Sequence, residues 1–219
     1  MVGMSMMQQD IVVDERYLEI FKDVTIYGVA GANASGKDGL MDLLVDHGFL
    51  QYHTSNSIRR ISQAVFKSTD RGGNEAPMGI IGNAMRSVYP GGPVELGLLD
   101  WWLAVSVLPE ELRPKGLVIG SIRAVGEVER LKQVGGKLIV VDADQRVRYD
   151  RIMSRQRADD PVSFEVFKEH EDAELAHGET DPTKFGMAAV IDSADITIVN
   201  NGDSIEDFRK QVIETLHLG

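Results

Sequence analysis

The chain of 219 residues contains no cysteine, which excludes disulfide bonds, thiolate metal sites and cysteine nucleophiles. Basic residues are also scarce, because 23 lysines and arginines stand against 34 acidic residues and give a formal net charge of −11. A chain this acidic has no long-range attraction for nucleic acid or for an anionic membrane, and we expect neither as a general partner. Arginines that cluster locally must therefore be explained by local anions.

Long apolar runs are missing as well. No segment approaches the length that spans a membrane, and the first ten residues lack the basic and then apolar form of a signal peptide. We therefore expect a cytoplasmic protein. Residues 1–13, with four methionines among the first seven, are expected to be a disordered leader. Residues 14–219 have the length of one α/β domain with a sizeable core.

The most informative stretch is a β-branched and apolar segment, residues 24–30, followed by the pattern Gly31-x4-Gly36-Lys37 and an amphipathic helical segment. That order is the context which a phosphate-binding loop requires. Glycines permit torsions that turn successive amide N–H groups toward a phosphate, and the helix adds its N-terminal amides and positive dipole end. The sequence therefore predicts a nucleotide-binding P-loop. The alternative is a glycine-rich turn that binds nothing.

Apolar strand patterns alternate with helical patterns along the rest of the chain. After the first strand we expect strands at residues 49–53, 116–120, 137–142 and 196–199. We expect helices at residues 15–23, 57–68, 78–88, 94–108 and 145–157, one ending near Val134, one after Ser163 and one opened by Ser204. This alternation predicts a three-layer α/β/α fold with a five-stranded, doubly wound parallel sheet. Ligands of such sheets bind at the carboxyl ends of the strands.

Four further segments follow the P-loop in a characteristic order. They are Gly82-Asn83-x-x-Arg86, Ile122-Arg123-x3-Glu127, Val140–Asp144 with the arginine-rich helix after it, and Ala194–Gly202. With these segments the chain resembles P-loop kinases of the nucleoside monophosphate kinase group, above all dephospho-CoA kinase-like and deoxynucleoside monophosphate kinase-like proteins. The resemblance runs from about Val24 to the C-terminus and implies a P-loop kinase domain with a helical lid, using ATP and Mg²⁺.

The resemblance also implies the residues of the site. The donor nucleotide would be bound by Gly31, Asn33, Ala34, Ser35, Gly36, Lys37, Asp38, Gly39, Arg148, Asn200 and Asn201. The acceptor would be bound by Ser57, Arg59, Asn83, Arg86 and Arg123, with acceptor-binding helices over about 54–114. The catalytic residues would be Lys37, Arg123, Arg151 and Arg155, and the last two would belong to a lid over about 146–178.

Arginine suits a phosphate ligand because its planar fork can donate two hydrogen bonds to one phosphate group. For each arginine the plain alternative is a solvated surface charge or a helix ion pair. Arg123 has additional support, because it follows a strand end where ligands of such sheets bind. Phosphoryl transfer needs charge neutralisation and in-line positioning, so Lys37 and several arginines are sufficient machinery.

Two positions depart from the family pattern. Position 38 is Asp, where most P-loops carry Ser or Thr to hold magnesium, and the third strand ends at Gly120, where relatives usually carry an aspartate. Asp38, with Asp142 as a second candidate, is therefore the expected carboxylate for Mg²⁺.

The leading hypothesis is ATP- and Mg²⁺-dependent phosphoryl transfer to a nucleotide-like monophosphate, a nucleoside or deoxynucleoside monophosphate. The alternatives are a dephospho-CoA kinase-like small-molecule kinase and a nucleotide-binding ATPase switch or assembly factor. A switch needs Lys37 but neither Arg86 nor Arg123. A GTPase is disfavoured, because the sequence lacks an Asn-Lys-x-Asp guanine motif. The base, the sugar, the donor preference and the oligomeric state, a homodimer included, stay open.

Overall fold

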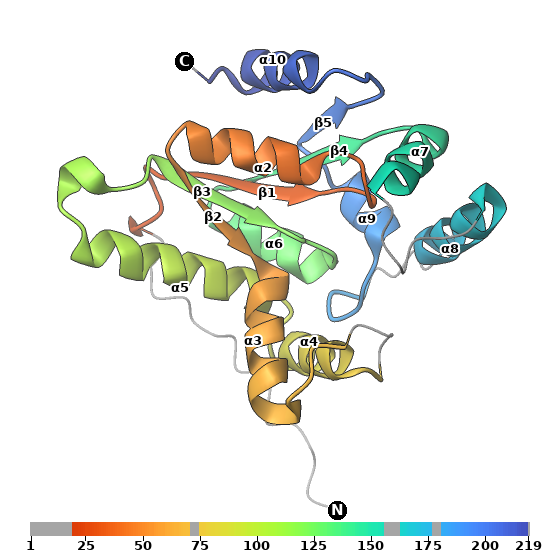
Figure 1. The fold of residues 1–219 in the computed structure, drawn as a ribbon. Coiled ribbons are helices and arrows are strands. Elements are labelled where there is room, and N and C mark those ends of the chain that lie inside the picture. Colours follow the sequence, from red (N-terminus) through yellow and green to blue (C-terminus); the bar gives the residue numbers. More distant parts are fainter. Residues whose placement is uncertain (1–18, 71–74, 156–162, 177–180, 219) are drawn as a thin grey trace, which may run out of the picture.

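The computed structural model describes residues 19–70, 75–155, 163–176 and 181–218 (Figure 1). Five parallel strands form one sheet in the order β2-β3-β1-β4-β5. The strands are β1 (Thr25–Ala30), β2 (Phe49–His53), β3 (Gly116–Gly120), β4 (Lys137–Asp142) and β5 (Ile196–Val199). The predicted α/β fold class with its five-stranded parallel sheet is confirmed. The expected leader, residues 1–13, lies outside the described residues.

Helices connect the strands in sequence order. They are α2 (Lys37–Asp46), α3 (Thr54–Phe66), α4 (Pro77–Val88), α5 (Gly92–Val107), the 3₁₀ helix η1 (Glu110–Leu112), α6 (Val125–Gln133), α7 (Gln145–Arg155), α8 (Phe164–Ala176), α9 (Met187–Asp192) and α10 (Ile205–Leu216). No helix in the described ranges is long and apolar enough to cross a membrane.

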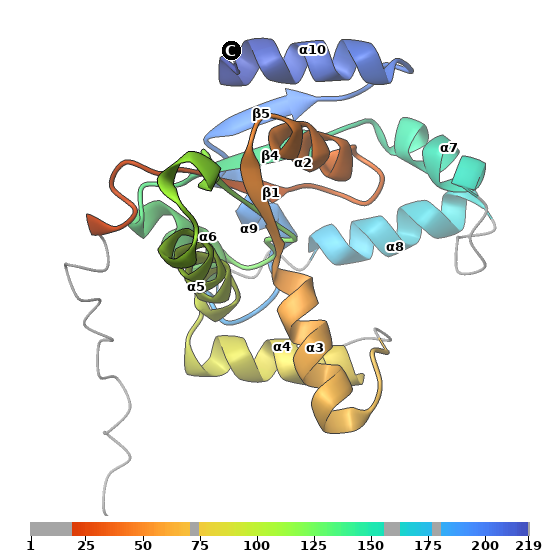
Figure 2. The ribbon, with the colours of Figure 1, turned by 60° about the vertical axis from the view of Figure 1, so that its left-hand side comes forward.

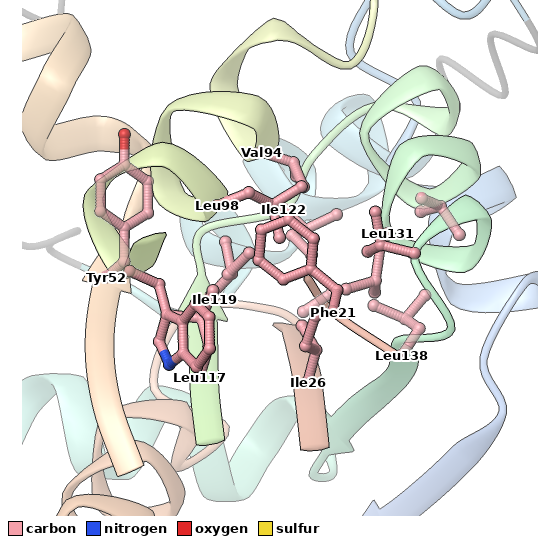
Figure 3. Packing of buried hydrophobic residues seen from close by; sticks show 14 of the residues in the cluster. Phe21, Ile26, Tyr52, Val94, Leu98, Leu117, Ile119, Ile122, Leu131 and Leu138 are labelled. Carbon is pink, nitrogen blue, oxygen red and sulfur yellow. The ribbon is translucent and has the colours of Figure 1, made fainter. Parts of the chain in front are cut away.

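β3 and the middle of β4 are buried on both faces, because their successive apolar side chains point to opposite sides. On one face Val118, Ile139 and Val141 pack against α2 and α10. On the other face Leu117 and Ile119 pack against α5, α6 and α9, together with Phe21 (Figure 3). The two cores fix the sheet between its helix layers, so the strand ends form a rigid edge for the site.

The helices α3 and α4 extend from the carboxyl end of β2, while α7 and α8 lie beyond the carboxyl end of β4 (Figure 2). The P-loop, between β1 and α2, lies at this same edge of the sheet. Segments far apart in the sequence are therefore placed around the P-loop.

Three details differ from the sequence-based expectations. The helix expected at residues 57–68 begins at Thr54, because the chain goes directly from the extended residue His53 into α3. The short helix α9 was not predicted, since six residues carry too little periodicity. The apolar spacing after Ser204 predicts a buried stripe that includes Ile205, but Ile205 is 70% exposed, whereas Phe208, Val212 and Leu216 are buried. The end of the expected helix 145–157 lies outside the described residues.

Candidate functional site

The loop between β1 and α2 has the torsions of a phosphate-binding loop. Gly31 has φ +136° and Gly36 has φ +111°, both in the region that favours glycine. A Cβ on Gly31 would lie 2.1 Å from the carbonyl oxygen of Val141, and a Cβ on Gly36 would lie 2.3 Å from Nδ2 of Asn200. Both glycines are therefore required by the backbone torsion and by the close approach of a neighbour.

Lys37 is the first residue of α2, and Gly36 before it has no side chain with which to cap the helix. The first amides of α2 therefore face the loop without a capping side chain. Nζ of Lys37 donates a hydrogen bond to the carbonyl oxygen of Ala32 at 2.5 Å and so lies across the loop. A helix N-terminus beside a lysine and a curled glycine loop is a site for an anion.

Asn200 and Asn201 join the end of β5 to the P-loop and to α7. Nδ2 of Asn200 donates to the carbonyl oxygen of Ser35 at 2.8 Å, and the side chain is almost fully buried. Oδ1 of Asn201 accepts from the backbone amide of Asp144 at 2.8 Å, just before α7 begins. Both asparagines thus brace the loop and the helix around it. Their expected contact with the donor base stays a prediction.

Two of the three arginines expected at the donor phosphates reach the P-loop from α7. Nη2 of Arg151 donates to the carbonyl oxygen of Gly202 at 2.7 Å, and its Nη1 donates to the carbonyl oxygen of Ala34 at 3.4 Å. Nη2 of Arg155 donates to Oδ1 of Asn33 at 3.4 Å. These guanidinium groups are therefore held at the tip of the loop, beside the place where phosphates would bind.

Arg148, the third of these arginines, has a different environment. Its side chain is 4% exposed, its Nε donates to the carbonyl oxygen of Ala143 at 2.7 Å, and its Nη1 is paired with Glu171 of α8. The expected contact of Arg148 with the donor nucleotide is not met in this arrangement, because the guanidinium fastens α7 to α8. The spacing of Arg148, Arg151 and Arg155 predicts that they lie on one face of a helix, but it does not predict which part of that face is buried.

Arg86 was expected to clamp the acceptor phosphate, but its side chain is only 1% exposed. Nε and Nη2 lie 2.9 and 2.8 Å from Oε1 of Glu127, and the guanidinium carbon is 4.5 Å from the centre of the Phe185 ring. Nη1 has no hydrogen-bond partner within the described ranges. A Cβ on Gly82 would lie 2.9 Å from Nη1, so the glycine makes room for the arginine one turn later. The guanidinium is thus buried and paired rather than presented to a ligand.

Glu127 was expected as part of a characteristic segment but without a role in the site. It is fully buried, and its Oε2 accepts hydrogen bonds from the backbone amides of Arg123 at 2.7 Å and Ala124 at 3.3 Å. The carboxylate thus links Arg86 of α4 to the turn after β3. Its signal was a glutamate in the first turn of a helix that follows a strand, the position at which a carboxylate binds the preceding backbone amides. The side chain of Arg123 is exposed at this turn.

The remaining acceptor candidates lie on α3 and α4. Oγ of Ser57 lies 2.5 Å from the Tyr52 hydroxyl, and burial raises the pKa of Tyr52, so this hydroxyl is protonated near neutral pH. Nη1 of Arg59 donates to Oδ1 of Asn56 at 2.9 Å. Asn83 is half-buried on α4. None of these contacts decides a role in acceptor binding, which stays a prediction.

Both carboxylates expected near the metal, those of Asp38 and Asp142, are exposed. Asp38 is exposed in the first turn of α2, next to Lys37. Oδ1 of Asp142 accepts from the amide of Ala143 at 2.8 Å. Across the described parts of the chain, no group of three or more His, Asp or Glu side chains could hold a metal ion. Asp38, beside Lys37 in the first turn of α2, fits Mg²⁺ as an oxygen donor, provided that phosphate oxygens and water complete the coordination.

At the end of β3 there is no room for the aspartate that the family resemblance implies at this position. A Cβ on Gly120 would lie 2.4 Å from Sδ of Met41 and 3.0 Å from Nδ1 of His53. Met41 and His53 therefore lie where the side chain of such an aspartate would begin.

No family model matches the chain. It is similar to a UPF0200 protein from Pyrobaculum aerophilum, with 29% identity over 88% of this chain and 97% of that protein. It is also similar to a UPF0200 protein from Thermococcus onnurineus, with 35% identity over 51% of this chain and 58% of that protein.

Two solved structures share the architecture. The protein TT1252 from Thermus thermophilus aligns with a TM-score of 0.54 at 16% identity, over 90% of this chain and 97% of that one. Shikimate kinase from Acinetobacter baumannii aligns with a TM-score of 0.50 at 13% identity, over 91% of this chain and 97% of that one. The chain therefore shares the α/β fold of these two proteins.

Proposed function

We propose that the protein transfers the γ-phosphoryl group of ATP to a small nucleotide-like acceptor, in the first place a nucleoside or deoxynucleoside monophosphate. The observation that carries this proposal is the P-loop, in which Gly31 and Gly36 adopt left-handed torsions and Lys37 lies across the loop. The kinase-like fold supports phosphoryl transfer as the reaction class. The identity of the acceptor goes beyond what the fold supports.

On the donor side, the α2 amides and Lys37 would hold the outer phosphates. Arg151 and Arg155 already donate to oxygens of the loop, namely those of Ala34 and Asn33. Exchange of these neutral acceptors for phosphate oxygens gives charge-assisted hydrogen bonds, which are about twice as strong. We therefore propose that the donor tightens α7 onto the loop. Mg²⁺, when bound beside Asp38, would neutralise phosphate charge.

On the acceptor side, Arg123 would bind the acceptor, with its backbone fixed by the carboxylate of Glu127. Arg86 acts through Glu127 as a positioning residue, since its own guanidinium is buried. A dephospho-CoA kinase-like reaction, in which the acceptor atom is a hydroxyl oxygen, is the second candidate. It is favoured by the imidazole of His53, which lies at the same strand ends as Arg123.

The first test is nucleotide binding by the Lys37→Ala variant. A ligand at one hundred times its dissociation constant adds about 2.7 kcal/mol to the free energy of unfolding, which is visible as a thermal shift with Mg-ATP. We expect this shift in the wild type and in the control Lys210→Ala, whose side chain is exposed on α10. Lys37→Ala should lose it. An unchanged shift in Lys37→Ala would refute the assignment of the P-loop.

The second test is ADP release from ATP in the presence of each ribo- and deoxynucleoside monophosphate and of dephospho-CoA. Release that depends on an acceptor supports a kinase. Nucleotide binding with ATP hydrolysis that no acceptor stimulates would instead support the nucleotide-binding switch. The Arg123→Ala variant separates the two readings further, because a switch has no use for an acceptor arginine.

A further inference from the structure

His53 is the last residue of β2 and lies beside the end of β3, at the carboxyl edge of the sheet. His53 and Gly120 are register partners in the two parallel strands, so their side-chain directions point to the same face. A Cβ on Gly120 would lie 3.0 Å from Nδ1 of His53 and 2.4 Å from Sδ of Met41. Because Met41 lies one turn after Lys37 in α2, the imidazole lies on the face of the sheet that carries the P-loop helix.

Among the described residues, the imidazole of His53 makes no hydrogen bond that would support the fold. His53 precedes α3, but its side chain makes no capping hydrogen bond. It is half-buried, and neither ring nitrogen has a hydrogen-bond partner among the residues that the structure describes. His47 provides the contrast, because its Nδ1 lies 2.8 Å from the carbonyl oxygen of Leu43 and so helps to close α2. His53 is therefore a half-buried acid–base group at a ligand edge with both nitrogens available.

The strand order fixes the separation between His53 and the P-loop. Gly120 pairs with His53 on one side and with Val29 of β1 on the other. Neighbouring strands are about 4.8 Å apart, which places the backbones of His53 and Val29 about 10 Å apart, and the P-loop begins two residues after Val29. A base at the end of β2, about 10 Å from the strand that leads into the P-loop, is suited to an acceptor held between the two strand ends.

We propose that His53 is the general base of the reaction and that the acceptor group is a hydroxyl. This inference rests on the proposed function and selects its second acceptor candidate, a hydroxyl, over the phosphate of a nucleoside monophosphate. The oxygens of a phosphate monoester are largely deprotonated near neutral pH, since the second pKa is about 6, and they need no base to attack. A hydroxyl retains its proton and needs a positioned base during transfer. An imidazole at this strand end is therefore suited to a hydroxyl of a nucleotide-like molecule.

The step balances without a further reactant. The hydroxyl oxygen forms a bond to the γ-phosphorus while the bond between that phosphorus and the β,γ-bridging oxygen breaks, and ADP leaves with the electron pair. The proton of the hydroxyl passes to a ring nitrogen of His53. The imidazolium later releases this proton to water. The products are ADP and a phosphate monoester.

The first test identifies the kind of bond that is formed in the product, and it needs only the wild-type protein. Wild-type protein is incubated with Mg-ATP and, separately, with nucleosides, dephospho-CoA and nucleoside monophosphates, and the products are examined by ³¹P NMR. We expect a new phosphate monoester resonance that belongs to the product. A phosphoanhydride resonance from a monophosphate acceptor would overturn the role of His53 and leave the proposed kinase function intact. Absence of acceptor-dependent transfer would overturn the kinase function itself, and this inference with it.

The second test compares His53→Asn with the matched control His47→Asn, using the acceptor identified in the first. Loss of a general base lowers the rate about 10²- to 10⁴-fold, so we expect kcat of His53→Asn to fall in this range. The dissociation constant of Mg-ATP should stay at its wild-type value, which also shows that the variant is folded. His47→Asn should keep its kcat. A wild-type kcat in His53→Asn would refute the proposal.

Discussion

Asn200 occupies the space that a side chain on Gly36 would need, with Nδ2 only 2.3 Å from the position of such a Cβ. The same nitrogen donates to the carbonyl oxygen of Ser35. The P-loop is thus shaped by the end of the last strand as much as by its own glycines. This arrangement makes the loop sensitive to substitutions that a motif alone would tolerate.

Gly36→Ala should abolish the thermal shift with Mg-ATP, because the new methyl group must displace Asn200. Gly135→Ala is the matched control: Gly135 has φ +77°, but nothing lies within 4 Å of the position of its Cβ. The control should show the cost of backbone strain, about 1 kcal/mol, and keep the nucleotide shift. Equal behaviour of the two variants in calorimetric melting would contradict a specific role for the contact with Asn200.

Arg86→Ala should destabilise the protein strongly. It leaves the carboxylate of Glu127 buried without its ion-pair partner, which costs about 3–5 kcal/mol in comparable cases. Arg146→Ala removes an exposed pair with Asp150 and should change the free energy of unfolding by less than about 1 kcal/mol. Urea unfolding measures both. Similar small losses for the two variants would show that the buried pair contributes little to stability. Any activity measured for Arg86→Ala has to be interpreted together with its loss of stability.

Arg123→Ala is the cleaner probe of the acceptor, because this side chain is exposed. A charge-assisted contact is worth roughly 1.5–3 kcal/mol, which corresponds to a loss of about ten- to a hundredfold in kcat/KM. Affinity for ATP should not change, and Arg113→Ala, at the opposite end of β3, should behave as wild type. If Arg123→Ala loses ATP affinity to the same extent, the residue belongs to the donor side.

Asp38 should make triphosphate binding unusually dependent on Mg²⁺. Two like charges about 4 Å apart repel by about 4 kcal/mol at an effective dielectric constant near 20, which exceeds the stabilisation of about 1 kcal/mol or less by the helix dipole. A bound cation reverses the sign of this interaction. Calorimetry with ATP in excess EDTA and in excess Mg²⁺ should show a far larger loss on chelation for wild type than for Asp38→Ser. Comparable losses would mean that Asp38 does not hold the metal.

The double variant Arg151→Ala/Arg155→Ala should transfer phosphate more slowly and hydrolyse relatively more ATP. Both arginines reach the tip of the P-loop, and closure of a lid protects a phosphoryl group from water. Arg146→Ala, on the exposed part of α7, serves as the control. The ratio of acceptor phosphorylation to phosphate release decides the matter, and an unchanged ratio counts against the lid.

The sheet could be predicted because its signals are local. The ends of β2, β3, β4 and β5 agree with the segments expected from apolar runs bounded by polar or glycine residues. The P-loop could be predicted for the same reason, since its motif and its flanking elements are consecutive in the sequence.

The roles of the arginines could not be predicted in the same way. Arg86 and Arg148 are buried by partners 41 and 23 residues away, Glu127 and Glu171. A helical spacing gives the face on which a residue lies but not what packs against that face. A role for His53 could not be predicted, because its place beside Gly120, a residue of another strand, is fixed only by the pairing of β2 with β3.

The bracing of the P-loop by Asn200 also has a consequence for the newly made chain. The residues that it connects, Ser35 and Asn200, are 165 positions apart, and the contact of Ala34 with Arg151 spans 117 positions. A ribosome adding 5–20 residues per second needs about 8–33 s to pass from Ser35 to Asn200. During that time a nascent chain carries the complete glycine motif without its supports. Under the proposed function, ATP would therefore stabilise only chains that already contain Asn200, and translation products truncated before it should gain no such protection from proteolysis.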